Sequence, residues 1–272
     1  MRRTPARSTS KPVPGGRLAV AAIHQLRAAI GRHPPGGAAF SFSGGKDSTA
    51  CAFLLRELAD QVVVYCVDTG DLLPETLETI AAVRPMFPHF QMLRTDVGSW
   101  IRDNGLPSDL VPYHSHWIGR AIGQARIPLV SRYDCCWHNI MWPILERVKE
   151  CGHTLLIRGT KAADMPRLPV GDGQTIDGIE MAYPLQAWSD DQVFAFLREQ
   201  PLPISPVYAH GKGQLDCATC PAWWSERRGA YLKANHPELF KAYASRFTAV
   251  TEALGEAFDA LVAEVDTVSG VF

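Results

Sequence analysis

Short runs of consecutive apolar residues alternate along this chain with longer segments whose apolar residues recur at helical spacing. The apolar runs predict buried strands at Ala38–Phe42, Val62–Val67, Phe90–Leu93 and Thr154–Ile157. The other segments predict helices over 17–30, 48–59, 114–124 and 139–150, and one more that starts at Pro74. Strands that alternate with helices imply βαβ units. We therefore predict an α/β fold with a doubly wound, mainly parallel sheet.

The pattern changes after about Tyr183, where helical spacing dominates. Helices are predicted there over 190–199, 222–235 and 237–265. At the other end, residues 1–16 are rich in proline, serine and arginine and hold no acidic residue, which is typical of a disordered tail. We predict a disordered basic tail over 1–16, one folded domain over 17–225, and a helical extension of that domain, giving a helical C-terminal part, over 226–272.

Composition narrows the class of protein. With 272 residues, 46% of them hydrophobic, the chain is long enough to bury a substantial core. No apolar run approaches the roughly 20 residues that a membrane span requires. The basic start is not followed by the apolar segment of a secretory signal. The formal net charge of −1 gives no overall attraction for nucleic acid. These features predict a cytoplasmic protein with no membrane span.

The first candidate site lies between the strand Ala38–Phe42 and the helix that follows it. The sequence there reads Ser41-Phe42-Ser43-Gly44-Gly45-Lys46-Asp47-Ser48. Glycines let the backbone approach a ligand closely, and the first N–H groups of a helix favour an anion. Lys46 adds a positive charge and the serines add hydroxyl donors. We predict a phosphate site here, with Asp47 either holding magnesium or capping the helix.

The cysteines form the second candidate site. Of the seven, Cys51, Cys66 and Cys151 lie in apolar patterns or at a helix end and are predicted to be buried. The other four form an adjacent pair and a CxxC motif: Cys135, Cys136, Cys217 and Cys220. Four thiolates suit either zinc or an iron–sulfur cluster. The spacing leaves both open, together with unliganded thiols, whereas a disulfide framework is disfavoured because no secretory signal is present.

Three segments resemble known families. The loop at residues 41–48 resembles that of the PP-loop proteins, which include ATP pyrophosphatases and sulfonucleotide reductases. Asp68-Thr69-Gly70, followed by Pro74-Glu75-Thr76, resembles a segment of the phosphoadenylyl-sulfate (PAPS) reductase family. The segment 157–167 resembles that family's basic loop, although Lys161-Ala162 stands where two arginines are usual. The resemblance covers about residues 20–225 and implies an adenine nucleotide alpha hydrolase-like, Rossmann-like domain that binds a nucleotide.

The resemblance also implies which residues bind the nucleotide. ATP with magnesium is the expected ligand, and adenylyl sulfate (APS) or PAPS is the alternative. Lys46, Asp47 and Arg158 are the predicted catalytic residues. The predicted binding residues are Ser41, Ser43, Gly44, Gly45, Lys46, Asp47, Ser48, Asp68, Thr69, Gly70, Lys161 and Arg167.

The order and spacing of the four paired cysteines resemble the 4Fe–4S signature of the adenylyl-sulfate reductase branch. This resemblance implies that Cys135, Cys136, Cys217 and Cys220 bind one 4Fe–4S cluster, with zinc as the alternative.

Two features separate the branches of the family. The string Ser-Gly-Gly-Lys-Asp-Ser is the form seen in enzymes that cleave ATP to AMP and pyrophosphate. No cysteine follows Cys220, whereas sulfonucleotide reductases use a cysteine in a C-terminal tail. We therefore expect ATP cleavage that activates an acceptor for sulfur transfer (thiolation). One alternative is a sulfonucleotide reductase whose catalytic cysteine comes from another chain. The other is a non-catalytic nucleotide-binding module with structural zinc.

The acceptor cannot be named from the sequence. Trp223-Trp224 and Arg227-Arg228, beside the CxxC motif, leave nucleic acid open as an acceptor, because such side chains stack on bases and bind phosphates. Aromatic residues beside a cluster also serve simply to exclude water. A sulfur donor or redox partner protein, and a homo-oligomer, are open as well.

Overall fold

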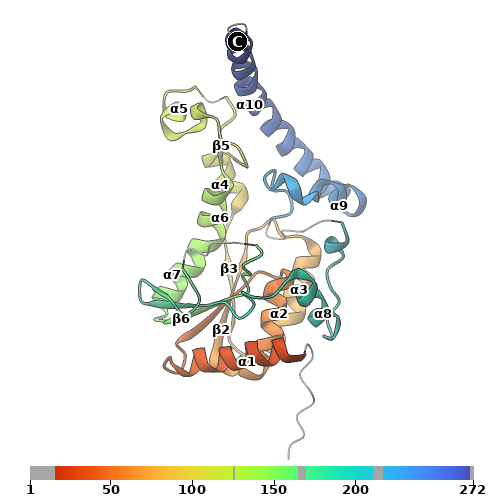
Figure 1. Cartoon of the computed structure of the whole chain (residues 1–272). Helices are drawn as coiled ribbons and strands as arrows, with labels where there is room; N and C mark the ends of the chain where they lie inside the picture. The colour runs from red at the N-terminus through yellow and green to blue at the C-terminus, as the bar shows by residue number, and fades with distance from the viewer. Residues whose placement is uncertain (1–15, 125, 165–169, 211–216, 270–272) are drawn as a thin grey trace, which may run out of the picture.

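The computed structural model describes residues 16–124, 126–164, 170–210 and 217–269 (Figure 1). Almost all of the predicted tail over 1–16, and the predicted ligand Arg167, lie outside these residues. The division into a domain over 17–225 and an extension over 226–272 stays a prediction.

A six-stranded sheet forms the centre of the molecule, with the strand order β3-β2-β1-β6-β8-β7. All neighbouring pairs are parallel except β7 with β8. The predicted α/β fold with a mainly parallel sheet is confirmed. The strands are β1 (Ala38–Phe42), β2 (Val62–Asp68), β3 (Phe90–Arg94), β6 (Leu155–Arg158), β7 (Thr175–Ile176) and β8 (Ile179–Ala182).

Helices cover both faces of this sheet, as a doubly wound fold requires (Figure 1). On one face, α1 (Gly16–Gly31), α2 (Lys46–Leu55), α3 (Pro74–Val83) and α8 (Asp190–Arg198) pack on side chains such as Phe40 and Val64. On the other face, α7 (Trp142–Glu150) packs on Tyr65 and Leu156. Successive strand residues thus enter opposite cores, because side chains alternate along a strand.

A second part of the molecule lies above the sheet in Figure 1. The two-stranded parallel sheet of β4 (Leu106–Ser108) and β5 (Leu129–Ser131) packs through Leu129 on Val250 and Leu254 of the long helix α10 (Pro237–Ser269). The other elements here are α4 (Val97–Asn104), η3 (Tyr113–Ser115), α5 (Trp117–Ala121), α6 (Arg132–Cys136), the π-helical turn η4 (Trp137–Met141) and α9 (Arg228–Asn235). Among the described residues, no helix is long and apolar enough to cross a membrane.

The structure differs from the sequence-based prediction at several elements. The helix expected over 48–59 is α2 followed by the 3-10 turn η1 (Arg56–Gln61), and the one expected over 114–124 is divided into η3 and α5. The helix expected over 222–235 begins only at Arg228, after the turn η6 (Trp224–Glu226). Cys51 and Cys66 are buried as predicted, but Cys151 is exposed, because it follows the last residue of α7.

Candidate functional site

The loop of residues 43–48, called the phosphate loop below, joins β1 to α2 at the carboxyl edge of the sheet. Gly44 has a φ of +76°, and a Cβ there would lie 2.9 Å from the Thr76 side chain of α3. The hydroxyls of Ser43 and Ser48 lie 3.1 Å apart, and the Ser48 hydroxyl donates to the carbonyl of Gly45. Glycine is therefore required for the close approach, and the serines fix the shape of the loop.

The segment after β6 packs directly on the phosphate loop. A Cβ on Gly159 would lie 2.9 Å from backbone atoms of Asp47 and Ser48. The side chain of Lys161, two residues later, is fully buried, and its Nζ lies 2.8 Å from Asp47 Oδ1. Residues that follow the neighbouring strands β1 and β6 thus meet at the carboxyl edge of the sheet. The chain order of the strands runs in opposite directions from this pair, and open α/β sheets bind ligands at such a point.

Five charged groups form a network at this edge. Lys161 Nζ contacts Asp47, Asp164 at 2.5 Å and Asp190 at 3.2 Å. Lys46 Nζ contacts Asp47 at 2.8 Å and Asp190 at 3.0 Å. The three carboxylates and two ammonium groups carry a formal sum of −1. Each lysine of the site is thus held by at least two carboxylates.

The network shifts the pKa values of its members. Burial alone would lower the pKa of Lys161, but its hydrogen bonds to Asp164 and Asp47 outweigh burial and raise the pKa. Burial would raise the pKa of Asp190, but the hydrogen bonds and charges of Lys46 and Lys161 hold it below its usual range. Both groups therefore stay charged at neutral pH.

The segment after β2 connects this edge to the cysteines. Asp68 Oδ1 accepts a hydrogen bond from the backbone N–H of Gly70, and the buried Thr69 hydroxyl lies 3.5 Å from Cys217 Sγ. Asp71 Oδ2 accepts from the Thr219 hydroxyl at 2.7 Å and from Arg246 at 3.3 Å. Because β2 pairs with β1, one short segment extends from the phosphate loop to the CxxC motif.

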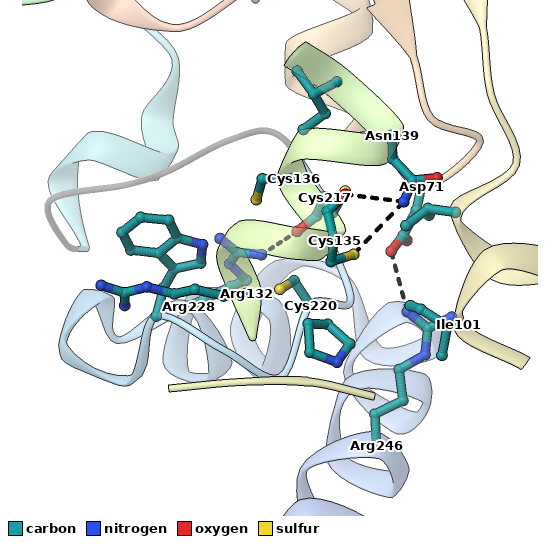
Figure 2. A pocket seen from close by; sticks show the side chains of 14 residues that line it. Asp71, Ile101, Arg132, Cys135, Cys136, Asn139, Cys217, Cys220, Arg228 and Arg246 are labelled. Atoms are coloured by element: carbon teal, nitrogen blue, oxygen red, sulfur yellow. Dashed lines mark hydrogen bonds and ion pairs between the residues drawn. The ribbon is translucent and has the colours of Figure 1, made fainter. Parts of the chain in front are cut away.

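The four paired cysteines line one pocket of about 450 Å³, called the thiol pocket below (Figure 2). Cys135 and Cys136 end α6, and Cys217 and Cys220 lie on the turn that follows the segment 211–216. Cys135 is buried and the other three are partly exposed. Asn139, one turn after Cys135, donates to the Cys135 carbonyl at 3.0 Å. The structure therefore brings together all four cysteines that the sequence singled out.

Arginines surround the thiol pocket and hold its walls (Figure 2). Arg228 is buried and donates to the carbonyl of Cys217. Arg246 donates to the hydroxyl of Thr219 at 2.6 Å. The Arg132 guanidinium lies 3.8 Å from the centre of the Trp223 ring and 2.9 Å from Asp109. The CxxC turn is therefore fixed by side chains from distant helices.

Asp109 explains why the helix expected from 222 begins late. Its carboxylate accepts from the backbone N–H groups of Trp223 at 2.9 Å and Trp224 at 3.2 Å. Trp223 and Arg227 both have a positive φ, which is rare for residues with side chains. The chain is thus held in a non-helical turn at the rim of the thiol pocket.

The protonation of the thiols affects whether they can bind a metal. Burial, with a contribution from the nearby Cys220, raises the pKa of Cys135 to about 12, and burial also raises the pKa of Cys220. In the parts of the chain that the structure describes, no three His, Cys, Asp or Glu side chains converge closely enough to hold one metal ion. The donor type alone fits iron or zinc.

Several side chains at the phosphate loop and the thiol pocket were not predicted from the sequence. Ser41 and Arg158 lie opposite each other on β1 and β6. Asp47 does not cap α2, which begins after Gly45 without a side-chain cap. The residues that were not predicted are Asp71, Asp164, Asp190, Tyr208, Arg132 and Arg246. Asp190 had a signal only as a helix start, after Ser189 in a capping box, and Tyr208 had none.

Comparisons with known proteins agree with this geometry. Residues 37–98 match the phosphoadenosine phosphosulfate reductase domain. The adenosine 5'-phosphosulfate reductase of Allochromatium vinosum is 24% identical over 184 residues, which is 66% of each chain. The protein of that name from Deinococcus radiodurans is 26% identical over 164 residues, 58% of this chain and 55% of that protein. The matches therefore span two thirds of these relatives or less.

A solved structure is similar in fold. The phosphoadenylyl-sulfate reductase from Candida auris, determined as a phosphate complex, has a TM-score of 0.51 and 16% identity, and covers 76% of this chain and 90% of that chain. The domain match includes β1, the phosphate loop and the Asp68–Asp71 segment, the elements on which the site is built. Residues 37–98 therefore match a domain of the phosphoadenosine phosphosulfate reductase family, and about two thirds of the chain is similar to adenosine 5'-phosphosulfate reductases.

Proposed function

We propose that this protein uses an adenine nucleotide to activate an acceptor for sulfur transfer, with ATP bound at the phosphate loop and sulfur handled at the thiol pocket. The observation that carries this proposal is the 3.5 Å contact between Thr69 and Cys217, because it joins the nucleotide edge to the cysteines.

The phosphate loop supplies what pyrophosphate release needs. An acceptor oxygen attacks the α-phosphorus of ATP, the bond to the β-phosphate breaks, and pyrophosphate leaves with the electron pair. Lys46 and the N–H groups at the start of α2 stabilise the charge that develops there. The network of Asp47, Asp164 and Asp190 with two lysines has a formal sum of −1, so a magnesium ion that accompanies ATP would offset repulsion.

The second half-reaction is a substitution. Hydrosulfide attacks the activated acceptor carbon, the carbon–oxygen bond breaks, and AMP leaves, so no electrons are gained or lost. Cys135, Cys136, Cys217 and Cys220 would hold a 4Fe–4S cluster with one thiolate on each iron, and a separate sulfur donor would supply the hydrosulfide. Zinc is the alternative for the same four thiolates. Arg132, Arg228 and Arg246 line the pocket and would offset thiolate charge.

Reduction of a sulfonucleotide is the second candidate function. It is favoured by the relatives named adenosine 5'-phosphosulfate reductase. In this candidate a cysteine outside the thiol pocket attacks the sulfur of APS or PAPS, and another chain supplies it. The thiol pocket and the phosphate loop would serve this reaction too, so the choice depends on which nucleotide binds.

Calorimetric titration separates the two candidates. Anaerobically purified protein is titrated with ATP and magnesium, with APS and with PAPS, and adenosine serves as the control without phosphate. We expect ATP to bind more tightly than either sulfonucleotide. A clear preference for APS or PAPS, together with sulfite formation when a dithiol is added, would replace our proposal with the reductase.

A further inference from the structure

Tyr208 lies at the phosphate loop although the sequence around it carries no nucleotide-binding signal. It belongs to the 3-10 turn η5 (Pro206–Ala209), which follows α8. Its hydroxyl oxygen accepts a hydrogen bond from the backbone N–H of Lys46 at 2.7 Å. Its ring packs edge-on against Phe194, with the ring centres 5.6 Å apart. The ring is thus supported independently of the hydroxyl.

The N–H group that Tyr208 occupies is one that an anion would use. Lys46 is the first residue of α2, so its N–H has no partner within the helix. Such N–H groups at the start of a helix bind phosphate oxygens. A phosphate on this loop therefore competes with the neutral phenol for the same donor.

A second observation concerns two buried hydroxyls in the pocket that Tyr208 lines. Tyr208 lines a pocket together with Lys46, Thr49 and Ser205. The hydroxyl oxygens of Thr49 and Ser205 are buried and have no hydrogen-bond partner among the residues that the structure describes, and Thr49 is only 5% exposed. Buried hydroxyls without a partner are costly, so both favour a state in which a polar group reaches them.

We propose that Tyr208 is a displaceable cap on the phosphate loop, which sets the affinity for phosphate-bearing ligands. In one state its hydroxyl occupies the Lys46 N–H. In the other state the whole side chain shifts, so that its hydroxyl enters the pocket and bonds to Thr49 or Ser205, leaving the N–H to a phosphate oxygen. This inference rests on the proposed nucleotide site and adds the residue that controls access to it. A ligand shifts such an equilibrium by its preference for one state.

The test measures binding of inorganic pyrophosphate, ATP with magnesium, and adenosine to the full chain. Tyr208→Phe keeps the ring on Phe194 and removes the competing acceptor. We expect it to tighten pyrophosphate and ATP binding by about three- to tenfold, the contribution of one hydrogen bond. Adenosine binding should not change. Tyr113→Phe, an exposed tyrosine on η3, is the matched control and should bind all three as the wild type does.

A double-mutant cycle tests the second state. Thr49→Val combined with Ser205→Ala removes both hydroxyls that would bond to the shifted Tyr208. These changes should therefore weaken pyrophosphate binding about threefold or more when Tyr208 is present. In the Tyr208→Phe background the same two substitutions should not change pyrophosphate binding, because the Tyr208 hydroxyl that would bond to Thr49 or Ser205 is already absent. Thermal unfolding confirms that each variant is folded.

Several outcomes would overturn the cap. Weaker or unchanged pyrophosphate binding in Tyr208→Phe would make the tyrosine a ligand or a bystander. Equal losses from the Thr49 and Ser205 changes in both backgrounds would show that these hydroxyls contact the phosphate directly. If neither the wild type nor Tyr208→Phe binds pyrophosphate or ATP, both the proposed nucleotide site and the Tyr208 cap are wrong. If wild type binds ATP and the variants do not differ, only the cap is wrong.

Discussion

The phosphate loop and the thiol pocket are joined by one short segment, yet different kinds of contact hold them in place. The loop is contiguous in sequence and closely packed, since a Cβ on Gly44 would meet the Thr76 side chain and one on Gly159 would meet the backbone of the loop. The thiol pocket is assembled from two distant cysteine pairs and is held by side chains such as Asp71 and Arg246. We infer that the loop is sensitive to added volume, and the pocket to lost hydrogen bonds and lost thiols.

The largest expected effect is at the thiol pocket. Cys217→Ser removes one of four thiolates, so iron content and the broad absorbance near 400 nm should be lost in anaerobically purified protein. Cys151→Ser, at an exposed cysteine outside the pocket, is the matched control and should keep both. Unchanged iron in Cys217→Ser would remove the cluster from our account.

The next largest effect concerns Asp71, whose hydrogen bonds hold the CxxC turn of the thiol pocket. Asp71→Ala removes the acceptor of the Thr219 hydroxyl and one of the acceptors of Arg246, and should lower the free energy of unfolding by about 3 kcal/mol. Asp68→Ala removes a contact only to the nearby Gly70 N–H and should cost less. Urea unfolding of both variants measures the difference. Equal losses would show that the Asp71 hydrogen bonds do not hold the CxxC turn.

Added volume tests the phosphate loop. Gly159→Ala places a methyl group 2.9 Å from the backbone of Asp47 and Ser48, so the loop must shift. We expect about 2 kcal/mol of lost stability and weaker ATP binding. Gly31→Ala, where a Cβ meets open space, should be neutral or slightly stabilising. If Gly159→Ala binds ATP as the wild type does, close packing of this segment is not needed for the site.

The sequence predicted more of the phosphate loop than of the region around the thiol pocket. The phosphate loop, its strand and its helix were predicted because their signals are contiguous. The strand β8 was missed, since Ile179-Glu180-Met181-Ala182 holds a single β-branched residue among four. The turn at Trp223 was taken for helix, because the Asp109 carboxylate that binds its N–H is far away in sequence. Long-range contacts of this kind carry no local signal.

In the thiol pocket, the sequence predicted the four cysteines as a group but did not predict that Arg132 and Arg246 lie beside them. Their spacing predicted that they belong together, and the structure places all four around one pocket. The arginines that line the same pocket could not be assigned, because Arg132 and Arg246 come from α6 and α10, which lie far apart in the chain. Cys151, which was expected to be buried at the end of a helix, is exposed.

The smallest effect concerns acid stability at the junction of α3 with the C-terminal helices. Glu75 accepts hydrogen bonds from the Tyr231 hydroxyl and from His236 at 2.7 Å. Burial would raise the pKa of Glu75, but these hydrogen bonds outweigh it and hold the pKa below its usual range. The stability this group contributes is present above the unfolded pKa of about 4.3 and is lost as pH falls through the lower folded pKa.

Glu75→Gln should therefore lower stability at neutral pH and give a shallower loss between about pH 4.3 and more acid conditions. Unfolding by urea at a series of pH values measures this slope. Parallel curves for the variant and the wild type would show that Glu75 does not contribute to acid sensitivity.

The most direct test of two distinct sites on one segment measures ATP affinity and iron content together in Lys46→Ala and Cys136→Ser. Lys46→Ala should weaken ATP binding by about 1.5–3 kcal/mol, the loss of a charge-assisted contact, and keep its iron. Cys136→Ser should lose its iron and retain much of its ATP affinity. Loss of iron in Lys46→Ala, or of all ATP binding in Cys136→Ser, would contradict a phosphate site and a thiol site that form independently.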